Sequence, residues 1–422
     1  MGRRRRADEH QHGNRLAAHD GLAVAVRERG RLRVGQPDGG GRRRAVADEG
    51  DAMNIAIAGG ITGGHLFPAL TVAQALQARG HSVLYLGAQH GIEARVELPV
   101  PHALLEMSGL RSTKRTPWSV PLTIWRASRE ARRVLEPFGA ELLFTTGGYA
   151  SIPIAMAYLK RGRGLILLEP DALPGKANRW LAKRAARICV NFEEATGAFG
   201  AERVVRTGLP LRPEVYQPEL EQGRARDEFG LKREKFTVLV VGGSQGAAAL
   251  NEAVLNTVQY LPSGELQWLH LTGEAHYETV RATAERMGLN GNYHPRPFLN
   301  APQMGVAYRA ADVVVGRGGA GSLTEFALNG LPMIVIPYPH AAGGHQRYNC
   351  QALAKRGAAI LLEQAELSPQ TLAEQLLSLR DCPELRARIQ DAARQWAIPN
   401  ATERIVQLLE EVGACIRPQA SV

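Results

Sequence analysis

The sequence has few cysteines and no long apolar run. Its 422 residues contain four cysteines, which form no C-x-x-C pair and have no histidine cluster beside them: Cys189, Cys350, Cys382 and Cys415. This scattering argues against a disulfide framework or a structural zinc site, and it fits a reducing cytosol. No apolar stretch approaches the roughly 18–20 residues that span a bilayer, so any membrane contact is expected to be peripheral.

The positive charge is unevenly distributed. The net charge is +10, and residues 1–52 alone hold 12 arginines, no lysine and 8 acidic residues. This segment lacks the apolar core of a signal peptide, so export is not expected. We interpret it as a basic arm, as a disordered extension, or as sequence that precedes a true start at Met53, and we favour the last interpretation. No nucleic-acid recognition motif accompanies the basic charge, so nucleic acid is not an expected partner.

From Met53 onward, short apolar runs alternate with longer helical patterns. Strands that are apolar on both faces and separated by helices are typical of parallel α/β units. The predicted strands are Asn54–Ala58, Ser82–Leu86, Leu142–Thr145, Leu165–Leu168, Thr237–Val241, Trp268–Thr272, Asp312–Val315 and Met333–Pro337. The pattern restarts after a Pro- and charge-rich stretch at 210–228. The predicted fold class is therefore α/β, with two Rossmann-like domains whose parallel sheets face a central cleft.

Three glycine-rich loops each follow a predicted strand: Gly59–His65, Gly242–Ala247 and Gly316–Gly321. Such loops expose backbone N–H groups at a helix N-terminus, where the helix dipole favours an anion. One loop alone is explained as well by a tight turn, but three loops on two matching domains indicate phosphate binding. The first loop leads into a predicted helix at 67–79, with Pro68 near its start and Gly80 after its end.

The third loop also matches the dinucleotide pattern G-x-G-x-x-G. No acidic residue ends the following strand to bind a ribose there, so a dinucleotide cofactor is not expected. Arg317 in this loop suits a phosphate, and Glu325 in the next helix suits the two hydroxyls of a ribose, which together favour a nucleoside diphosphate. The chain has no D-x-D triplet, so Arg317 and helix termini, rather than a metal, are expected to stabilise a leaving diphosphate.

Seven motifs recur in the order found in one known family. They are "GGITGGHLFPAL" at 59–70, "SGLR" at 108–111, "GGYAS" at 147–151, "PGKANRWLA" at 174–182, "VVGGSQGAAALN" at 240–251, "ADVVVGRGGAGSLTE" at 311–325 and "PYPHAAGGHQRYN" at 337–349. The chain resembles the MurG family, the undecaprenyl-diphospho-muramoyl-pentapeptide β-N-acetylglucosaminyltransferases of bacterial cell-wall synthesis. The likeness covers residues 53–412, and the clustered motifs are far more specific together than singly.

The resemblance implies a GT-B architecture and a UDP-N-acetylglucosamine donor in the second domain. The domains would be an acceptor-binding unit at 53–212, a donor-binding unit at 213–395, and a C-terminal segment at 396–422 whose helix crosses back to the first domain. By their match to family positions, the predicted donor-binding residues are Arg212, Ser244, Gln245, Phe298, Leu299, Arg317, Ala320, Glu325, Gln346 and Asn349. No cofactor and no metal are implied.

The resemblance also implies an inverting transfer to the 4-hydroxyl of a lipid-linked muramoyl-pentapeptide, converting lipid I to lipid II. The predicted acceptor-binding residues are Thr62, Gly63, Gly64, Tyr149, Asp171 and Asn178. His65 is the predicted base, because an imidazole pKa of about 6.5 suits proton transfer near neutral pH. The alternative is that His65 only satisfies backbone groups of the loop. Glu169 is the rival base or the group that orients the base.

The sequence departs from the family pattern mainly on the acceptor side. The family's His-Glu-Gln-Asn segment reads Leu168-Glu169-Pro170-Asp171 here. Ile61 stands where the family usually has glycine, and Leu209 stands where it usually has asparagine. Gly343-Gly344 replace polar residues before His345, a position at which the family has glutamine or histidine. The donor is therefore better supported than the acceptor. Two alternatives stay open: an isomerase like the UDP-N-acetylglucosamine 2-epimerases, and a UDP-sugar-binding paralogue whose acceptor activity is altered or lost.

A segment at 108–133 mixes tryptophan and aliphatic residues with arginine and lysine. Basic residues beside exposed aromatics suit an anionic membrane surface, whereas an ordinary amphipathic helix would turn its aromatics to the core. A lipid-linked acceptor favours the first interpretation. The predicted location is the cytoplasmic face of the bacterial plasma membrane, bound peripherally.

Overall fold

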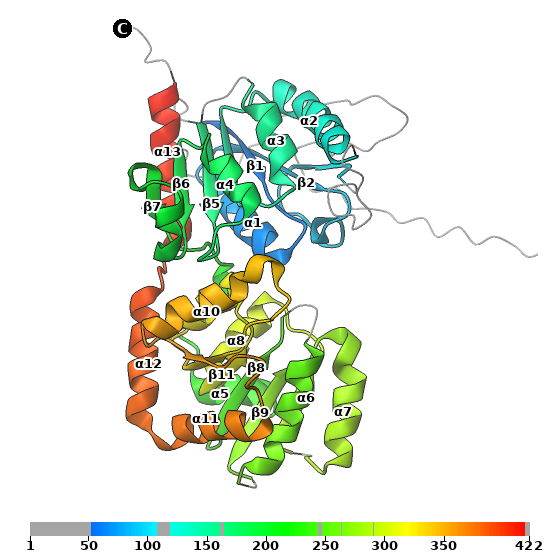
Figure 1. Ribbon diagram of the computed structural model, residues 1–422, viewed down its shortest axis with the longest axis vertical. Coiled ribbons are helices and arrows are strands. Elements are labelled where there is room, and N and C mark those ends of the chain that lie inside the picture. The colour runs from blue at the N-terminus through cyan, green and yellow to red at the C-terminus, as the bar shows by residue number, and fades with distance from the viewer. Residues whose placement is uncertain are drawn as a thin grey trace, which may run out of the picture. The chain divides into compact units, whose positions relative to one another are not determined.

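The structure is a computed structural model that describes residues 52–107, 119–160, 164–243, 247–262, 264–289 and 291–417. These residues belong to one compact unit that contains two parallel β-sheets, each with its own helices (Figure 1). The predicted positions Ser244 and Gln245, and residues 108–118 of the basic and aromatic segment, lie outside the described residues.

The first sheet has seven parallel strands. In pairing order they are β3 (His102–Leu105), β2 (Ser82–Ala88), β1 (Asn54–Ala58), β4 (Leu142–Thr145), β5 (Gly164–Glu169), β6 (Arg187–Val190) and β7 (Val204–Arg206). Every residue of β4 and β5 is buried, because helices cover both faces of the sheet. The pairing order reverses direction between β1 and β4, and their carboxyl ends carry two glycine-containing loops.

The second sheet has six parallel strands and repeats this plan. In pairing order they are β10 (Tyr293–Arg296), β9 (Leu266–Leu271), β8 (Phe236–Val241), β11 (Val313–Gly316), β12 (Met333–Val335) and β13 (Ile360–Leu361). Its order reverses between β8 and β11, where the other two glycine-rich loops begin. Ligands of open α/β sheets bind at such reversal points, outside the carboxyl ends of the strands. The predicted α/β class with two parallel sheets is confirmed.

Helices connect the strands of both sheets. Those of the first half are α1 (Gly63–Ala78), α2 (Ser119–Phe138), α3 (Ser151–Tyr158) and α4 (Lys176–Ala182). The second half has α5 (Gln222–Glu228), α6 (Ala248–Thr257), α7 (Tyr277–Arg286), α8 (Ala301–Ala310), α9 (Ala320–Leu328), α10 (His345–Lys355), α11 (Pro369–Asp381) and α12 (Pro383–Trp396). The last helix is α13 (Ala401–Ile416).

Two details differ from the sequence-based expectation. The helix predicted at 67–79 begins at Gly63, so the last glycines of the first loop belong to its first turn and Pro68 lies inside the helix. Five further strands, β3, β6, β7, β10 and β13, complete the sheets. They were missed because they are short and four of them, β3, β6, β7 and β10, contain arginine or histidine, which weakens the apolar signal.

The helix α13 packs against the first half of the chain. It contacts α1, β4 and β5, and its buried side chains include Ile405 and Leu409. A Cβ atom at Gly413 would lie 2.1 Å from the sulfur of Met53, so the last helix closely approaches the residue before β1. Arg79 donates to Glu410 at 2.8 Å on the same surface.

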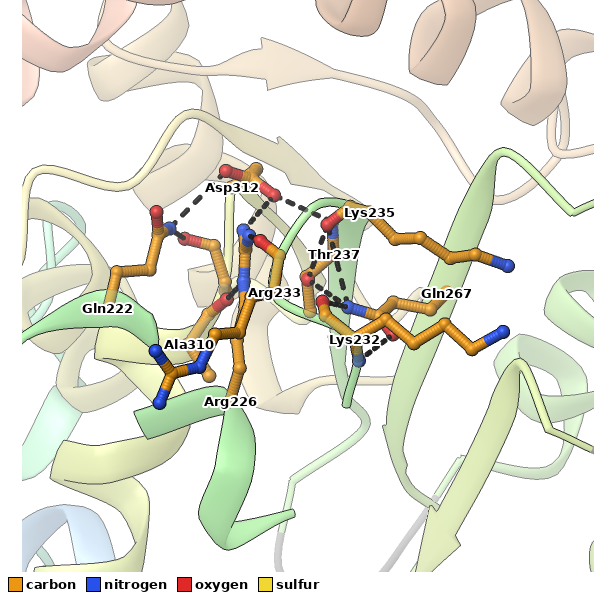
Figure 2. Close-up of polar contacts among 10 residues, drawn as sticks. Gln222, Arg226, Lys232, Arg233, Lys235, Thr237, Gln267, Ala310 and Asp312 are labelled. Carbon is orange, nitrogen blue, oxygen red and sulfur yellow. Dashed lines mark hydrogen bonds and ion pairs between the residues drawn. The ribbon is translucent and has the colours of Figure 1, made fainter. Parts of the chain in front are cut away.

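A partly buried ion pair connects α5 to the second sheet, as Figure 2 shows. The Arg226 guanidinium donates to Asp312 Oδ2 at 2.5 Å and to the carbonyl of Ala310 at 3.0 Å. Asp312 also accepts the backbone N–H of Thr237 at 2.7 Å, which ties the loop before β11 to β8. Burial raises the pKa of Asp312, and the contacts with Thr237 and Arg226 oppose that rise.

Candidate active site

His65 lies in the first turn of α1, beside the loop that follows β4. Its Nδ1 atom is 2.8 Å from the carbonyl oxygen of Thr146, and the Thr146 hydroxyl donates to the His65 carbonyl at 2.8 Å. Because a carbonyl only accepts, Nδ1 must carry the proton, and Nε2 then holds a lone pair. Burial lowers the pKa of His65, while the nearby Asp171 carboxylate opposes that shift. A neutral imidazole with a basic Nε2 can accept a proton from a hydroxyl group.

The loop after β4 fits against this imidazole. Gly148 has φ of 78°, and a Cβ atom added to it would lie 3.5 Å from His65 Nε2. Gly147 has φ of 82°, and a Cβ there would lie 1.9 Å from Asn178 Oδ1. The Asn178 amide oxygen accepts the Gly148 N–H at 3.1 Å. Glycine is therefore required at 147, and Asn178 sets the position of the loop beside His65.

Glu169 ends β5 and is 1% exposed. Its carboxyl oxygens accept the backbone N–H of Asp171 at 2.9 Å and the Asn178 amide at 2.8 Å. Burial, with a smaller contribution from the charge of Asp171, raises the pKa of Glu169 to about 8. Both oxygens are engaged and the group is out of reach of solvent. This geometry favours the orienting role for Glu169 over direct proton transfer. Glu169 holds the Asn178 amide, and Asn178 holds the Gly148 N–H beside the His65 ring.

The loop after β5 is hydrogen-bonded to α10 and to the third glycine loop. Asn349 is fully buried, and its amide donates to Asp171 Oδ1 at 2.8 Å and to the Gly318 carbonyl at 3.1 Å. His345 Nδ1 lies 2.8 Å from the carbonyl of Leu173 and 3.9 Å from Asp171 Oδ2. Asn349 is a predicted donor-binding residue, and its amide donors connect the loop after β5 to the third glycine loop.

Arg317 is a buried cation in the third glycine loop. It is 6% exposed, donates to the carbonyl of Ile336 at 3.2 Å, and lies 5.7 Å from the ring centre of Tyr338. Burial lowers its pKa. The Gln346 amide oxygen accepts the N–H groups of Gly318 at 3.2 Å and Tyr338 at 2.9 Å, which fixes the loop around the guanidinium. A desolvated guanidinium at the end of a strand suits a phosphate.

Glu325 lies one turn into α9, within reach of Arg212. The Tyr308 hydroxyl donates to Glu325 Oε2 at 2.5 Å. Burial raises the pKa of Glu325, and the hydrogen bond from Tyr308 and the charge of Arg212 oppose the rise. Arg212 also places its guanidinium carbon 4.3 Å from the ring centre of Phe67. A cavity of about 360 Å³ opens beside Arg212, lined by the two chain segments around 209–216 and 397–402 and by α9.

The remaining predicted residues differ in accessibility. Thr62 and Gly64 are exposed at the start of α1, Gly63 is partly exposed, and Tyr149 is 50% exposed. Phe298 is 57% exposed on the loop after β10, so it offers an open aromatic face. Two neighbouring donor positions are buried: Leu299 and Ala320, the latter beginning α9.

Three residues of this region were missed in the sequence. Thr146 fixes the tautomer of His65, Tyr308 hydrogen-bonds Glu325, and the buried Glu93 contacts the first glycine loop. Thr146 was detectable, because it directly follows a buried strand and precedes two glycines. The other two lie in ordinary helical or turn sequence and carry no local signal.

Comparisons with known proteins identify the family of the chain. The glycosyltransferase family 28 N-terminal domain matches residues 55–190, and the C-terminal domain of that family matches residues 237–405. The UDP-N-acetylglucosamine--N-acetylmuramyl-(pentapeptide) pyrophosphoryl-undecaprenol N-acetylglucosamine transferase of Desulforamulus reducens is 36% identical over 371 residues, 85% of this chain and 99% of the relative. The crystal structure of Acinetobacter baumannii MurG is 29% identical with a TM-score of 0.69, over 85% of this chain and 99% of that one.

The epimerase alternative has weaker support. The crystal structure of the UDP-GlcNAc 2-epimerase from Neisseria meningitidis bound to UDP-GlcNAc matches with a TM-score of 0.60 over 85% of this chain and 99% of that one, but at 13% identity, which shows the fold alone. The transferase relative shares about a third of its residues with this chain. The predicted family, GT-B fold and enzyme class are thus confirmed: the chain is a glycosyltransferase of family 28 and belongs to its MurG family.

Proposed function

We propose that the chain carries out the reaction named for its relatives, moving N-acetylglucosamine from its UDP donor to a pyrophosphoryl-undecaprenol-linked N-acetylmuramyl-pentapeptide, with His65 as the base. The observation that carries the proposal is the contact between His65 Nδ1 and the Thr146 carbonyl, which leaves Nε2 as a proton acceptor. This acceptor lies at the strand-order reversal of the first sheet, where ligands of such sheets bind.

In the proposed reaction, the acceptor 4-hydroxyl attacks the anomeric carbon of the donor sugar. The hydroxyl proton passes to His65 Nε2, the new glycosidic bond forms, and the bond to the UDP oxygen breaks with inversion of configuration. Positioned bases of this kind contribute about 10²- to 10⁴-fold in rate. Glu169 orients the base through Asn178 and Gly148 and does not itself take the proton.

On the donor side, Arg317 and the N-terminus of α9 at Ala320 would meet the diphosphate as negative charge develops on the leaving UDP. Tyr308 donates to Oε2 of Glu325, so the other carboxylate oxygen would accept hydrogen bonds from the ribose hydroxyls. Phe298, with Leu299 behind it, would stack on the uracil. The further proposed donor-binding residues are Arg212, Ser244, Gln245 and Gln346. Asn349, whose amide donates to Asp171 and Gly318, is assigned to holding the loops beside the donor.

On the acceptor side, exposed N–H groups at the start of α1 would bind the acceptor diphosphate. Thr62, Gly63 and Gly64 supply these groups, and a Cβ at Gly64 would meet nothing within 4 Å, so this side of the loop is open. Tyr149, the residue after Gly148, offers an exposed ring. We assign Asn178 and Asp171 to holding the loops rather than to direct acceptor contact, since their polar atoms already have partners.

The test measures UDP release from UDP-N-acetylglucosamine by the full chain, with and without a lipid-linked muramoyl-pentapeptide analogue. We expect release that depends on the acceptor. His65→Ala should lower kcat by about 10²- to 10⁴-fold and leave UDP affinity unchanged. His90→Ala removes an exposed histidine of the same half and serves as the control. Full activity in His65→Ala, or loss of UDP binding, would contradict the assigned role, and release without acceptor would favour a different reaction.

We also propose that α2 meets an anionic membrane surface from the cytoplasmic side. None of the helices within the described ranges is long and apolar enough to cross a membrane. On α2, Trp125 is 57% and Leu122 is 47% exposed, and the Arg129 guanidinium lies 5.8 Å from the Trp125 ring centre. The opposite face of α2 packs on the first sheet through Ala127 and Ala131. Exposed apolar groups next to arginines suit an anionic headgroup layer.

Vesicle co-sedimentation tests this surface. The double variant Trp125→Ser, Leu122→Ser should bind phosphatidylglycerol-containing vesicles several-fold more weakly than the parent chain, and high salt should weaken the parent's binding. Tyr260→Ser, which removes a 49% exposed aromatic from the second half, is the matched control. Unchanged binding of the double variant would remove α2 from the proposed membrane surface.

A further inference from the structure

A buried carboxylate lies directly behind the first glycine loop. Glu93 follows β2 in a short 3-10 turn (Ile92–Ala94) and is 1% exposed. Its Oε2 accepts the backbone N–H of Ile61 at 2.8 Å, and its Oε1 accepts the same N–H at 3.1 Å and the N–H of Ala88 at 2.8 Å. Burying a carboxylate is costly unless its lone pairs are satisfied. Here backbone N–H groups satisfy them, and one of these groups belongs to the loop itself.

The loop residue that Glu93 contacts has an unusual backbone conformation. Ile61 has φ of 69°, and within the described ranges it is the one residue other than glycine with a positive φ. A β-branched side chain is strained in this left-handed region, and such strain persists only where the surroundings hold it. The side chain of Ile61 packs against the core on one side, and Glu93 holds its N–H on the other.

The space around Glu93 is shaped for the carboxylate. A Cβ at Gly60 would lie 2.3 Å from Glu93 Oε1, and a Cβ at Gly91 would lie 2.0 Å from Oε2. The Tyr85 hydroxyl lies at the same place, donating to the carbonyl of Gly59 at 2.9 Å. Two glycines and a buried tyrosine thus surround the carboxylate, which fixes the peptide plane between residues 60 and 61.

We infer that Glu93 is a positioning residue for the acceptor side of the transfer reaction. By holding the Ile61 N–H inward, it sets the direction in which the chain enters α1, and so places the open N–H groups at Gly63 and Gly64 and the imidazole of His65. The Ile61 N–H is itself committed to Glu93 and takes no part in binding phosphate. This inference depends on the proposed roles of His65 and the first glycine loop.

The test compares Glu93→Gln with Glu97→Gln, a variant with the same charge change at an exposed position four residues away. Glutamine keeps one accepting oxygen, but it places an NH2 group, which only donates, where the second carboxylate oxygen accepts a backbone N–H. We expect Glu93→Gln to lower kcat/KM for the lipid-linked acceptor by about 10- to 100-fold, from the loss of a charge-assisted hydrogen bond. UDP affinity, which depends on the second half, should stay within about twofold, and Glu97→Gln should match the parent chain.

A rescue separates positioning from general stability. Ile61→Gly removes the strain that Glu93 holds, because glycine adopts a positive φ freely. Adding Glu93→Gln to Ile61→Gly should therefore cost less than about threefold in acceptor kcat/KM, a coupling that a double-mutant cycle measures. Unchanged acceptor kinetics in Glu93→Gln, or a loss that Ile61→Gly does not reduce, would overturn the inference. A parent chain that releases no UDP with acceptor would instead contradict the proposed function.

Discussion

The pH dependence of the transfer reaction tests the state of His65 most directly. A histidine acts as a base only when its imidazole is neutral, so activity is present above the pKa of His65 and is lost as pH falls through that pKa. Burial lowers this pKa below its ordinary value of 6.5. At a pKa of 6.5, about half of the imidazole would be neutral at pH 6.5 and about nine-tenths at pH 7.5. Because the pKa is lower, kcat/KM at pH 6.5 should retain more than about half of its value at pH 7.5.

Substitutions of two residues near His65 should shift the pH midpoint of the activity loss at low pH in opposite directions. The Asp171 carboxylate raises the pKa of His65 and the charge of His345 lowers it. Asp171→Asn should therefore shift the midpoint to lower pH, because it removes the negative charge that favours the protonated imidazole. His345→Gln should shift it to higher pH.

The assay is acceptor-dependent UDP release between pH 5 and pH 8. The midpoint is determined separately from the maximal rate, so weaker substrate binding in either variant does not obscure it. A midpoint above pH 6.5 in the parent chain, or a shift to higher pH in Asp171→Asn, would refute the assignment of the activity loss at low pH to His65.

Three further predictions concern the second half. Tyr308→Phe should raise the donor KM by about 2- to 12-fold through loss of a hydrogen bond, with the acceptor KM unchanged in steady-state kinetics. Gly318→Ala places a Cβ 2.4 Å from a cysteine sulfur, so the donor KM should rise by about tenfold or more, whereas Gly319→Ala, with nothing within 4 Å, should behave as the parent. Arg226→Met leaves the partly buried Asp312 without its cation, and urea denaturation should show a free energy of unfolding lower by about 1–3 kcal/mol. An unchanged value for any of the three variants would contradict the corresponding contact.

The parts of the fold set by local sequence were predictable. Central strands such as β1 and β4 are continuous apolar runs, and their predicted limits match the structure. The glycine loops stand out because they interrupt those runs. The start of α1 was placed four residues late, since glycine pairs ordinarily end or precede helices and here they form the first turn.

The connections within the candidate site were not predictable. Glu169 and Asn178 come from different elements and pair only because β5 and α4 pack together. The buried state of Glu93 depends on Gly60, about 30 residues away in the chain, as well as on the neighbouring Gly91. A single sequence shows such residues as ordinary polar positions, since burial and partner are set by the tertiary arrangement. The sequence singled out Glu169, Asn178 and Gln346 as well as His65 and Arg317, but it did not predict the hydrogen bonds through which the first three hold the loops.

The return of α13 to the first half affects how the protein is made. The first sheet is complete at Arg206, but the helix that covers α1, β4 and β5 begins only at Ala401, about 200 residues later. At a synthesis rate of about 5–20 residues per second, that interval lasts roughly 10–40 seconds. During this time the nascent first half exposes an apolar surface that chaperones would bind. A translation product that stops before Ala401 would keep that surface exposed and become a substrate for proteolysis, even with every active-site residue present.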